Sequence, residues 1–303
     1  DPASALPPGF YLAAERALRE VHALIEGQEF DTADDLEARL AELIRRGSIC
    51  GKARALKQDN LKWRAQELAY DALDAEDPFE AAQLAIEALD LDPDCTDAQR
   101  VLVWLAPTEL DNRIQLMREV VEKAERNLGE EFMEENRGHF WGLLSTRPYM
   151  RAMRDLAELL LEADRLDEAI AVYERMLDLN PNDNQGVRYA LLGLYLGAGR
   201  ADRAAELFDR YPGEEDYSAA FAWGRVIMDW LEGDEAAARL ALINARRVNP
   251  FVEKYLTGRQ PMPKTLPPAY SPGEPSEAQV AASELWPACK ALPEFRAWLG
   301  HQK

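Results

Sequence analysis

The sequence predicts an all-α fold, a right-handed superhelical solenoid of about five helix pairs with further helices at both ends. Three observations favour this fold class. Segments at 80–94, 168–182 and 235–251 share one pattern, and each reaches a proline near its end. The distances between these prolines fit a repeat of about 34 residues. In the segments between them, apolar residues recur at steps of three and four, as on one face of an α-helix.

The repeat is defined by residues at fixed distances before Pro93, Pro181 and Pro250. Small or apolar residues stand twelve, eight and five positions before each proline: Ala81, Ala85 and Ala88; Ala169, Tyr173 and Met176; Ala238, Leu242 and Ala245. A small alanine lets two helices approach closely, and a proline ends a helix because it forces the preceding residue out of the α region. A whole further unit fits at 187–212, and surplus residues around 126–147 predict an insert.

The helices follow in order from this repeat. First helices of the pairs are predicted at 62–75, 98–105, 148–163, 185–198 and 217–232. Before the repeats, helical patterns occur at 9–27 and 31–46, and the second begins at an Asp31-Thr32 cap. Residues 47–60 contain Gly, Ser and Lys and predict a connection.

The chain is therefore expected to contain three regions. Residues 1–60 form an N-terminal helical extension, and residues 61–255 form the solenoid. Residues 256–303 begin with a strap that has too many prolines for a helix, followed by helices at 276–290 and 293–300. Because the ends of a solenoid expose an apolar face, we expect these last helices to cap it.

The spacing of alanine, aromatic residue and proline resembles that of the tetratricopeptide repeat over residues 62–255. The segments GHFWG, TRPYMRA and NPNDNQGVRY are also similar to a family of bacterial tetratricopeptide proteins with no assigned activity. The resemblance implies an interaction scaffold and carries no catalytic residue across. Co-chaperone domains of this kind grip a C-terminal carboxylate with Lys, Asn and Arg on successive first helices. That set is absent here, so binding of the chaperone tail is not implied.

Composition narrows the function further. The 303-residue chain has 35 basic and 55 acidic residues and a net charge of −20, which argues against nucleic acid and anionic membranes as partners. No apolar run reaches the roughly 18–20 residues of a membrane span. Three separated cysteines (Cys50, Cys95 and Cys289) fit a reducing cytoplasm, and three histidines are too few for a His-rich metal site. We predict no cofactor and no metal. The chain lacks an initial Met and a signal-peptide pattern, so we expect it to be trimmed.

The insert contains the most unusual residues of the chain. His139 lies beside Trp141 and follows Glu135 closely. A histidine near carboxylates can transfer protons, so one interpretation is an enzyme or small-molecule sensor centred on His139, Glu135 and Arg147. The other is a loop that folds its aromatic side chains into the solenoid. The sequence favours the loop, because no second histidine, nucleophile motif or metal-ligand spacing accompanies His139.

Arginines gather at the predicted start of the 148–163 helix. Arg147, Arg151 and Arg154 follow one another at helical spacing, with Tyr149 between them. In an acidic chain, such a cluster at a helix start favours a carboxylate or phosphate ligand. The alternative interpretation is ion pairing with the chain's own Asp and Glu residues.

A second polar cluster opens the 185–198 helix. Gln185, Arg188 and Tyr189 offer amide, guanidinium and phenol groups within about one and a half turns, as a reader of peptide backbone would. One of the Asn and Asp side chains at 180–184 should cap the helix that enters Val187.

Two helices carry features with two interpretations. Gly193 and Gly197 lie one turn apart, and they either admit a ligand or permit close helix packing. Trp223 and Trp230 lie seven apart on one face of the 217–232 helix. Packing is favoured over an aromatic ligand shelf for this pair.

Taken together, these patterns predict a binding scaffold and not an enzyme. Its concave groove would hold a protein or peptide segment, and a locally basic patch would favour acidic or C-terminal carboxylate groups. Because adjacent first helices line one wall, the starts of the 148–163 and 185–198 helices should lie side by side. The predicted ligand-facing residues are His139, Trp141, Arg147, Tyr149, Arg151, Arg154, Gln185, Arg188 and Tyr189. An enzyme or sensor at the insert, and self-association, are the alternatives.

Overall fold

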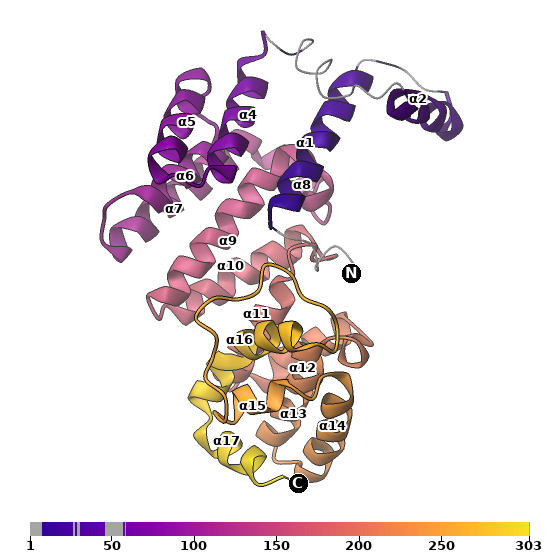
Figure 1. Ribbon diagram of the computed structural model, residues 1–303, viewed down its shortest axis with the longest axis vertical. Helices are drawn as coiled ribbons and strands as arrows, with labels where there is room; N and C mark the ends of the chain where they lie inside the picture. The colour runs from indigo at the N-terminus through magenta and orange to yellow at the C-terminus, as the bar shows by residue number, and fades with distance from the viewer. Residues whose placement is uncertain (1–7, 27, 29–30, 46–56, 58, 303) are drawn as a thin grey trace. The chain divides into compact units, whose positions relative to one another are not determined.

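The fold of the chain is all-α, as predicted. The computed structural model describes residues 8–26, 28, 31–45, 57 and 59–302, and these residues form helices and irregular connections without a strand (Figure 1). Most of the predicted connection at 47–60, with Cys50, lies outside the described residues. The chain divides into two compact units, the N-terminal unit of residues 8–164 and the C-terminal unit of residues 165–303. Each unit is described by itself.

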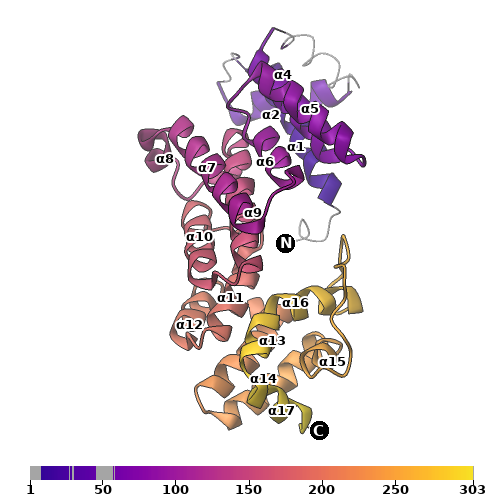
Figure 2. The ribbon, with the colours of Figure 1, turned by 90° about the vertical axis from the view of Figure 1, so that its left-hand side faces the viewer.

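The N-terminal unit is built from two antiparallel helix pairs and the helices that flank them. Its helices are α1 (Pro8–Ile25), α2 (Ala33–Arg45), α4 (Leu61–Asp74), α5 (Pro78–Leu91), α6 (Thr96–Leu105), α7 (Leu110–Leu128), α8 (Glu130–Glu135) and α9 (Arg147–Glu162). Helix α4 packs against α5, α6 against α7, and α7 against α9 (Figure 2). Asn60 caps α4 and Asp77 caps α5 by accepting backbone N–H bonds from Trp63 and Phe79.

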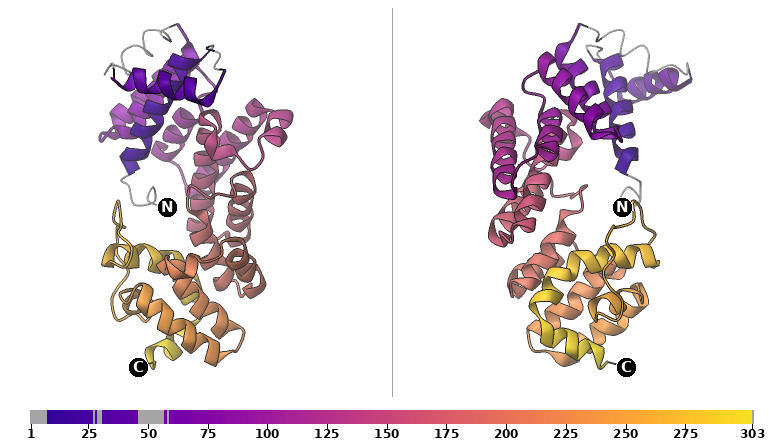
Figure 3. Two further views of the ribbon diagram at one scale, coloured as in Figure 1. Left: turned by 90° about the vertical axis from the view of Figure 1, so that its right-hand side faces the viewer. Right: turned by 60° about the vertical axis from the view of Figure 1, so that its left-hand side comes forward.

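The C-terminal unit continues the same alternation of helices. It contains α10 (Leu166–Leu179), α11 (Val187–Gly197), α12 (Ala201–Arg210), α13 (Ala219–Leu231), α14 (Glu235–Val248), α15 (Val252–Leu256), α16 (Pro275–Ala291) and α17 (Pro293–Gly300). Helix α11 packs against α10 and α12, and α13 packs against α14. The proline-rich segment between α15 and α16 has no helix and runs as an irregular loop (Figure 3).

The positions that define the repeat are all buried. The residues twelve, eight and five before the three prolines lie in α5, α10 and α14, and none exposes more than 6% of its surface. The further unit places Ala204 and Phe208 in the same roles, both buried in α12. The sequence pattern therefore marks the side chains that join the helices of each pair.

Close packing explains the two glycines of α11. A Cβ at Gly193 would lie 1.9 Å from the backbone oxygen of Glu284 in α16, and one at Gly197 would lie 2.9 Å from the carbonyl carbon of Pro287. Helix α16 thus rests directly on the backbone of α11, and it also packs against α13 (Figure 1). The face that these two first helices share is covered by α16 of the same chain.

The tryptophans of α13 also pack internally. Trp223 is fully buried, and its indole N–H donates to the backbone oxygen of Asn249 at 3.0 Å. The ring of Trp230 lies 5.6 Å from that of Phe295 in α17, in an edge-on arrangement. Both residues therefore belong to the packing of the C-terminal unit, which is the favoured interpretation from sequence.

The insert forms the turn between α7 and α9. It holds α8 and two 3-10 turns, Phe140–Gly142 and Leu144–Thr146. Phe140 is fully buried with its ring 6.2 Å from that of Tyr149. The insert is thus anchored on the start of α9 by an aromatic contact.

Candidate functional site

A buried ionic network lies where α1, α6 and α9 meet in the N-terminal unit. The guanidinium of Arg151 on α9 binds two carboxylates, Glu15 of α1 at 2.9 Å and Asp97 of α6 at 2.9 Å. Arg100 of α6 also donates to Asp97, at 2.8 Å, and to Asp155 of α9, at 2.7 Å. Glu15 is only 2% exposed and Asp97 is fully buried. Such groups must be paired, because an unpaired buried charge is strongly unfavourable.

Glu15 is the contribution of α1 to this network. Its carboxylate accepts hydrogen bonds from the phenol of Tyr70 at 2.6 Å, from Arg147 at 3.3 Å and from Arg151 through both terminal nitrogens. Two helices therefore converge on the carboxylate of α1: α4 through Tyr70, and α9 through the two arginines. The two-pronged contact of Arg151 is the geometry that best suits a carboxylate.

The protonation states of the network follow from its burial and charges. Burial alone would raise the pKa of Asp97, but Arg151, Arg100 and their hydrogen bonds outweigh it and hold that pKa well below its usual range. Burial, reinforced by Glu15, raises the pKa of Tyr70 above its ordinary value, so the phenol stays protonated and donates a hydrogen bond to Glu15.

An open cleft borders this network. Its volume is about 720 Å³, and its walls come from α1, α4, the turn at 92–96 and the insert at 142–148. The lining contains both cationic and anionic side chains. The cations are Arg19, Lys57, Lys62 and Arg147, and the anions are Glu26, Asp92 and Asp94. The volume falls within the range of ligand sites in proteins.

Trp63 lines the cleft with a buried indole N–H that has no hydrogen-bond partner among the described residues. It is 92% buried in α4, and the guanidinium of Arg19 lies 5.4 Å from its ring centre. A buried tryptophan N–H normally has a partner, so this one is an exception among the described residues.

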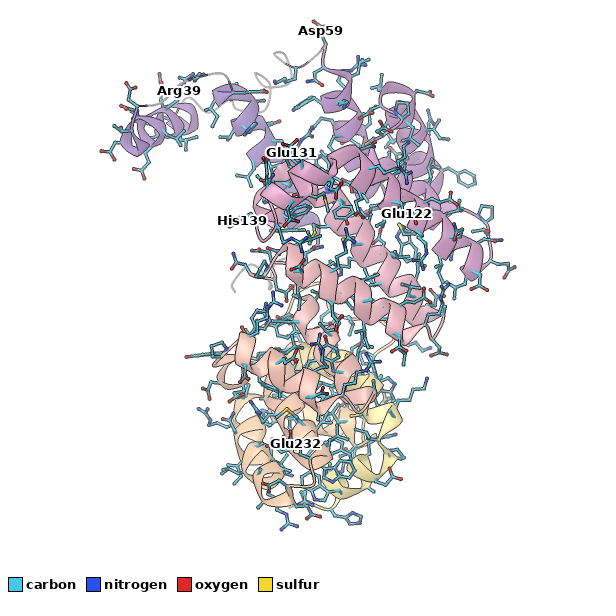
Figure 4. All side chains as sticks on the ribbon, turned by 180° about the vertical axis from the view of Figure 1, so that it is seen from behind. Arg39, Asp59, Glu122, Glu131, His139 and Glu232 are labelled. Carbon is cyan, nitrogen blue, oxygen red and sulfur yellow. The ribbon has the colours of Figure 1, made fainter. Side chains whose placement is uncertain are left out.

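The predicted residues of the insert divide between the cleft and the outside. Arg147 lines the cleft, and its Nε donates to the backbone oxygen of Trp141 at 3.0 Å, with the guanidinium 5.2 Å from the Trp141 ring centre. His139 is exposed, does not line the cleft and lies at the edge of the unit (Figure 4). Glu135 is exposed as well. The three groups of the enzyme interpretation are thus not assembled at the cleft.

The other predicted residues of α9 are occupied in different ways. Tyr149 is buried, and its hydroxyl donates to Glu125 of α7 at 3.3 Å. Arg154 is exposed and pairs with Glu158 one turn later, at 3.0 Å. Only Arg147 and Arg151 of the predicted set take part in the carboxylate network.

The predicted residues at the start of α11 form a separate cluster in the C-terminal unit. Asp183 caps α11 by accepting from the backbone N–H groups of Val187 and Arg188, at 2.8 and 2.9 Å, as expected for this turn. Arg188 is only 7% exposed and pairs with Asp183 at 3.1 Å and Glu214 at 3.2 Å. Its guanidinium lies 4.5 Å from the ring centre of Tyr189, whose hydroxyl donates to Glu214 at 3.1 Å.

These geometries correct the expectation that Arg151 and Arg188 are available to an outside anion. Both guanidinium groups are largely buried and bound to carboxylates of the chain itself. Gln185 is half-buried and lies two residues before the start of α11. Ion pairing with the chain's own acids, the alternative interpretation from sequence, describes the contacts of both arginines.

Residues 160–222 match the family described as Tetratricopeptide repeat. This part of the chain is tetratricopeptide-repeat sequence. The match covers α10, α11 and α12, where the helix-pair alanines are buried. No curated protein matches the chain.

The tetratricopeptide repeats make a protein-interaction scaffold the function that this fold suggests. Among the described residues, no group of three or more His, Cys, Asp or Glu side chains is arranged to hold a metal ion. None of the described helices combines the length and apolar composition needed to cross a bilayer.

Sequence reasoning missed the residues that organise the site. Glu15, Tyr70, Asp97 and Trp63 were not singled out, because each stands in an ordinary helical pattern. One signal was available for Glu15: it is the first acidic residue of a helix that is otherwise apolar and basic up to Arg19. Its partners on α9 follow more than 130 residues later, so no local spacing links them.

Proposed function

We propose that the chain is a scaffold that binds a protein or peptide segment in the cleft of its N-terminal unit. The observation that supports this proposal most strongly is the cleft of about 720 Å³ between α1, α4 and the insert. Extended concave surfaces of helical repeats serve such binding without an active site. The cleft is open, as a peptide requires, and it lies on α4, the first helix of a pair.

The charges of the cleft support a segment with acidic groups as the ligand. Lys62 is exposed on the cleft wall, whereas Arg147 at the insert side already shares its charge with Glu15, so Lys62 is the cation that would meet an acidic group. Asp94 of the opposite turn is already neutralised by Lys123, at 3.0 Å.

We also propose that the chain acts without catalysis and in the cytoplasm. Cys95 and Cys289 are free, buried thiols, which suits a reducing compartment. The enzyme or sensor alternative requires His139 at the cleft, and its exposed place outside the lining gives that alternative no support.

A matched pair of variants tests the cleft. Lys62 and Arg64 are both exposed cations on α4, but only Lys62 lines the cleft. Proteins captured from cell extract by the wild-type chain should be lost with Lys62→Glu and retained with Arg64→Glu. Equal capture by the two variants would refute the cleft as the binding site.

A further inference from the structure

We infer that the surface under α1 receives a helix from a partner protein, which exchanges with α1 and supplies a carboxylate in place of Glu15. This α1-binding surface consists of Glu67, Tyr70 and Asp71 on α4, Asp97 on α6, and Arg147 and Arg151 on α9. The inference rests on the proposed scaffold function and names the chemistry of its partner.

The charge balance of the network requires a carboxylate at this position. With Glu15 in place, three arginines face three carboxylates; the set is Arg100, Arg147, Arg151, Glu15, Asp97 and Asp155. Withdrawal of α1 removes one negative charge and leaves one net positive charge at Arg147 and Arg151, the groups that Glu15 had paired. Because buried charges need a counter-charge, the surface is selective for an occupant with a carboxylate at the Glu15 position.

The rim of the surface selects for arginines beside that carboxylate. Arg16 pairs with Asp71 of α4 at 2.7 Å, and Arg19 pairs with Glu67 of α4 at 2.6 Å. The acids of α4 thus pair with cations one and four residues after the glutamate. These two positions lie on one helix face. A partner helix of this chemistry has the pattern Glu-Arg-x-x-Arg.

Helix α1 is held by contacts that allow exchange. Among the described side chains of α1, only Glu15 and Ala23 are buried. The Arg16–Asp71 pair that joins α1 to α4 is partly exposed, and partly exposed ion pairs contribute little stability. Helix α16 is the contrast, since seven of its residues are buried and it rests on glycine backbone.

The cleft adds room for a longer occupant. Leu18, Val21, His22 and Ile25 of α1 form one of its walls, so a helix that replaces α1 would lie along the same space. Trp63 beneath Arg19 would then meet the occupant directly. A helix that replaces α1 would therefore contact both the ionic network and the cleft.

The probe for this inference is a fluorescent peptide with the sequence of residues 8–26. Its dissociation constant would be measured by anisotropy for the full wild-type chain and for Glu15→Lys, which repels α1 from Arg147 and Arg151. We expect the variant chain to bind the peptide at least tenfold more tightly than the wild type. A peptide carrying Glu15→Gln should bind the variant chain at least tenfold more weakly than the unmodified peptide.

The control is Glu158→Lys, an equal charge change on an exposed residue of α9 away from α1; it should bind the peptide as the wild type does. If Glu15→Lys loses helical circular dichroism, the neutral Glu15→Gln chain replaces it and should show the same direction of change. Equal affinities of the wild-type and Glu15 variant chains, or of the two peptides, would overturn the inference. So would dimers of the wild-type chain seen by light scattering and abolished by Glu15→Lys, since a second copy would then be the occupant. None of these readouts depends on Lys62, so a failure here is distinguishable from a failure of the cleft proposal.

Discussion

Substitution of Gly193 by alanine tests the contact between α11 and α16 most directly. The new Cβ would lie 1.9 Å from the backbone oxygen of Glu284 and 3.3 Å from the Cα of Leu285. Side-chain Cβ atoms do not approach other heavy atoms closer than 3.0 Å, so α16 must move by about 1 Å or more. No rotamer change can relieve the overlap, because the contacting atom belongs to the backbone.

Two opposing terms set the magnitude. Alanine is favoured over glycine inside a helix by about 1 kcal/mol, which alone would stabilise α11. Overpacking costs about 1–3 kcal/mol, and the upper value applies here since the backbone cannot yield locally. The net effect is a destabilisation of about 2 kcal/mol, or roughly a 30-fold increase in the opening of α16.

Hydrogen exchange measured by mass spectrometry on peptides from 275–291 reports this opening. Gly300→Ala in α17 is the control, because nothing lies within 4 Å of its new Cβ, and α16 should exchange as in the wild type. Unchanged or slower exchange in Gly193→Ala would mean that helix propensity dominates and that α16 does not rest on α11.

Three further predictions concern buried polar groups. The pKa of Asp97 is lowered in the folded chain. The carboxylate therefore stabilises the fold fully above its ordinary pKa of about 4, and this stabilisation is lost progressively as the pH falls below that value. The difference in Tm between the wild type and Asp97→Asn should shrink from pH 7 to pH 3. Glu277→Ala removes the acceptor of three N–H groups, from Ala219, Asn249 and Gly273, and should cost about 2–3 kcal/mol in urea unfolding. Burial raises the thiol pKa of Cys95 to about 12, so a thiol reagent followed by mass spectrometry should label it only after denaturation.

The helices could be predicted because their signals are local. The alanines at fixed distances before Pro93, Pro181 and Pro250 lie within one helix of the proline, and the Asp183 cap lies within five residues of the N–H groups it binds. Short-range rules of helix start, face and end are sufficient for such features.

The element that covers each helix face could not be predicted, because that element is distant from the helix in the sequence. Gly193 indicates a close approach, but no local pattern identifies α16, which begins at Pro275, as the approaching element. Arg151 likewise indicates an anion, and the carboxylate comes from Glu15, 136 residues earlier. Only tertiary structure determines which of the chain's 55 acidic residues an arginine meets.

The contact of α16 with α11 also bears on the order of synthesis and folding. In a simple repeat array each unit contacts only its neighbours, so folding can follow the emerging chain. Glu284 leaves the ribosome 91 residues after Gly193, a delay of about 5–18 s at a translation rate of about 5–20 residues per second. During that interval the glycine face of α11 has no cover. The C-terminal unit therefore completes its fold only after α16 has been synthesised, so the packing of α11 depends on a segment far along the chain.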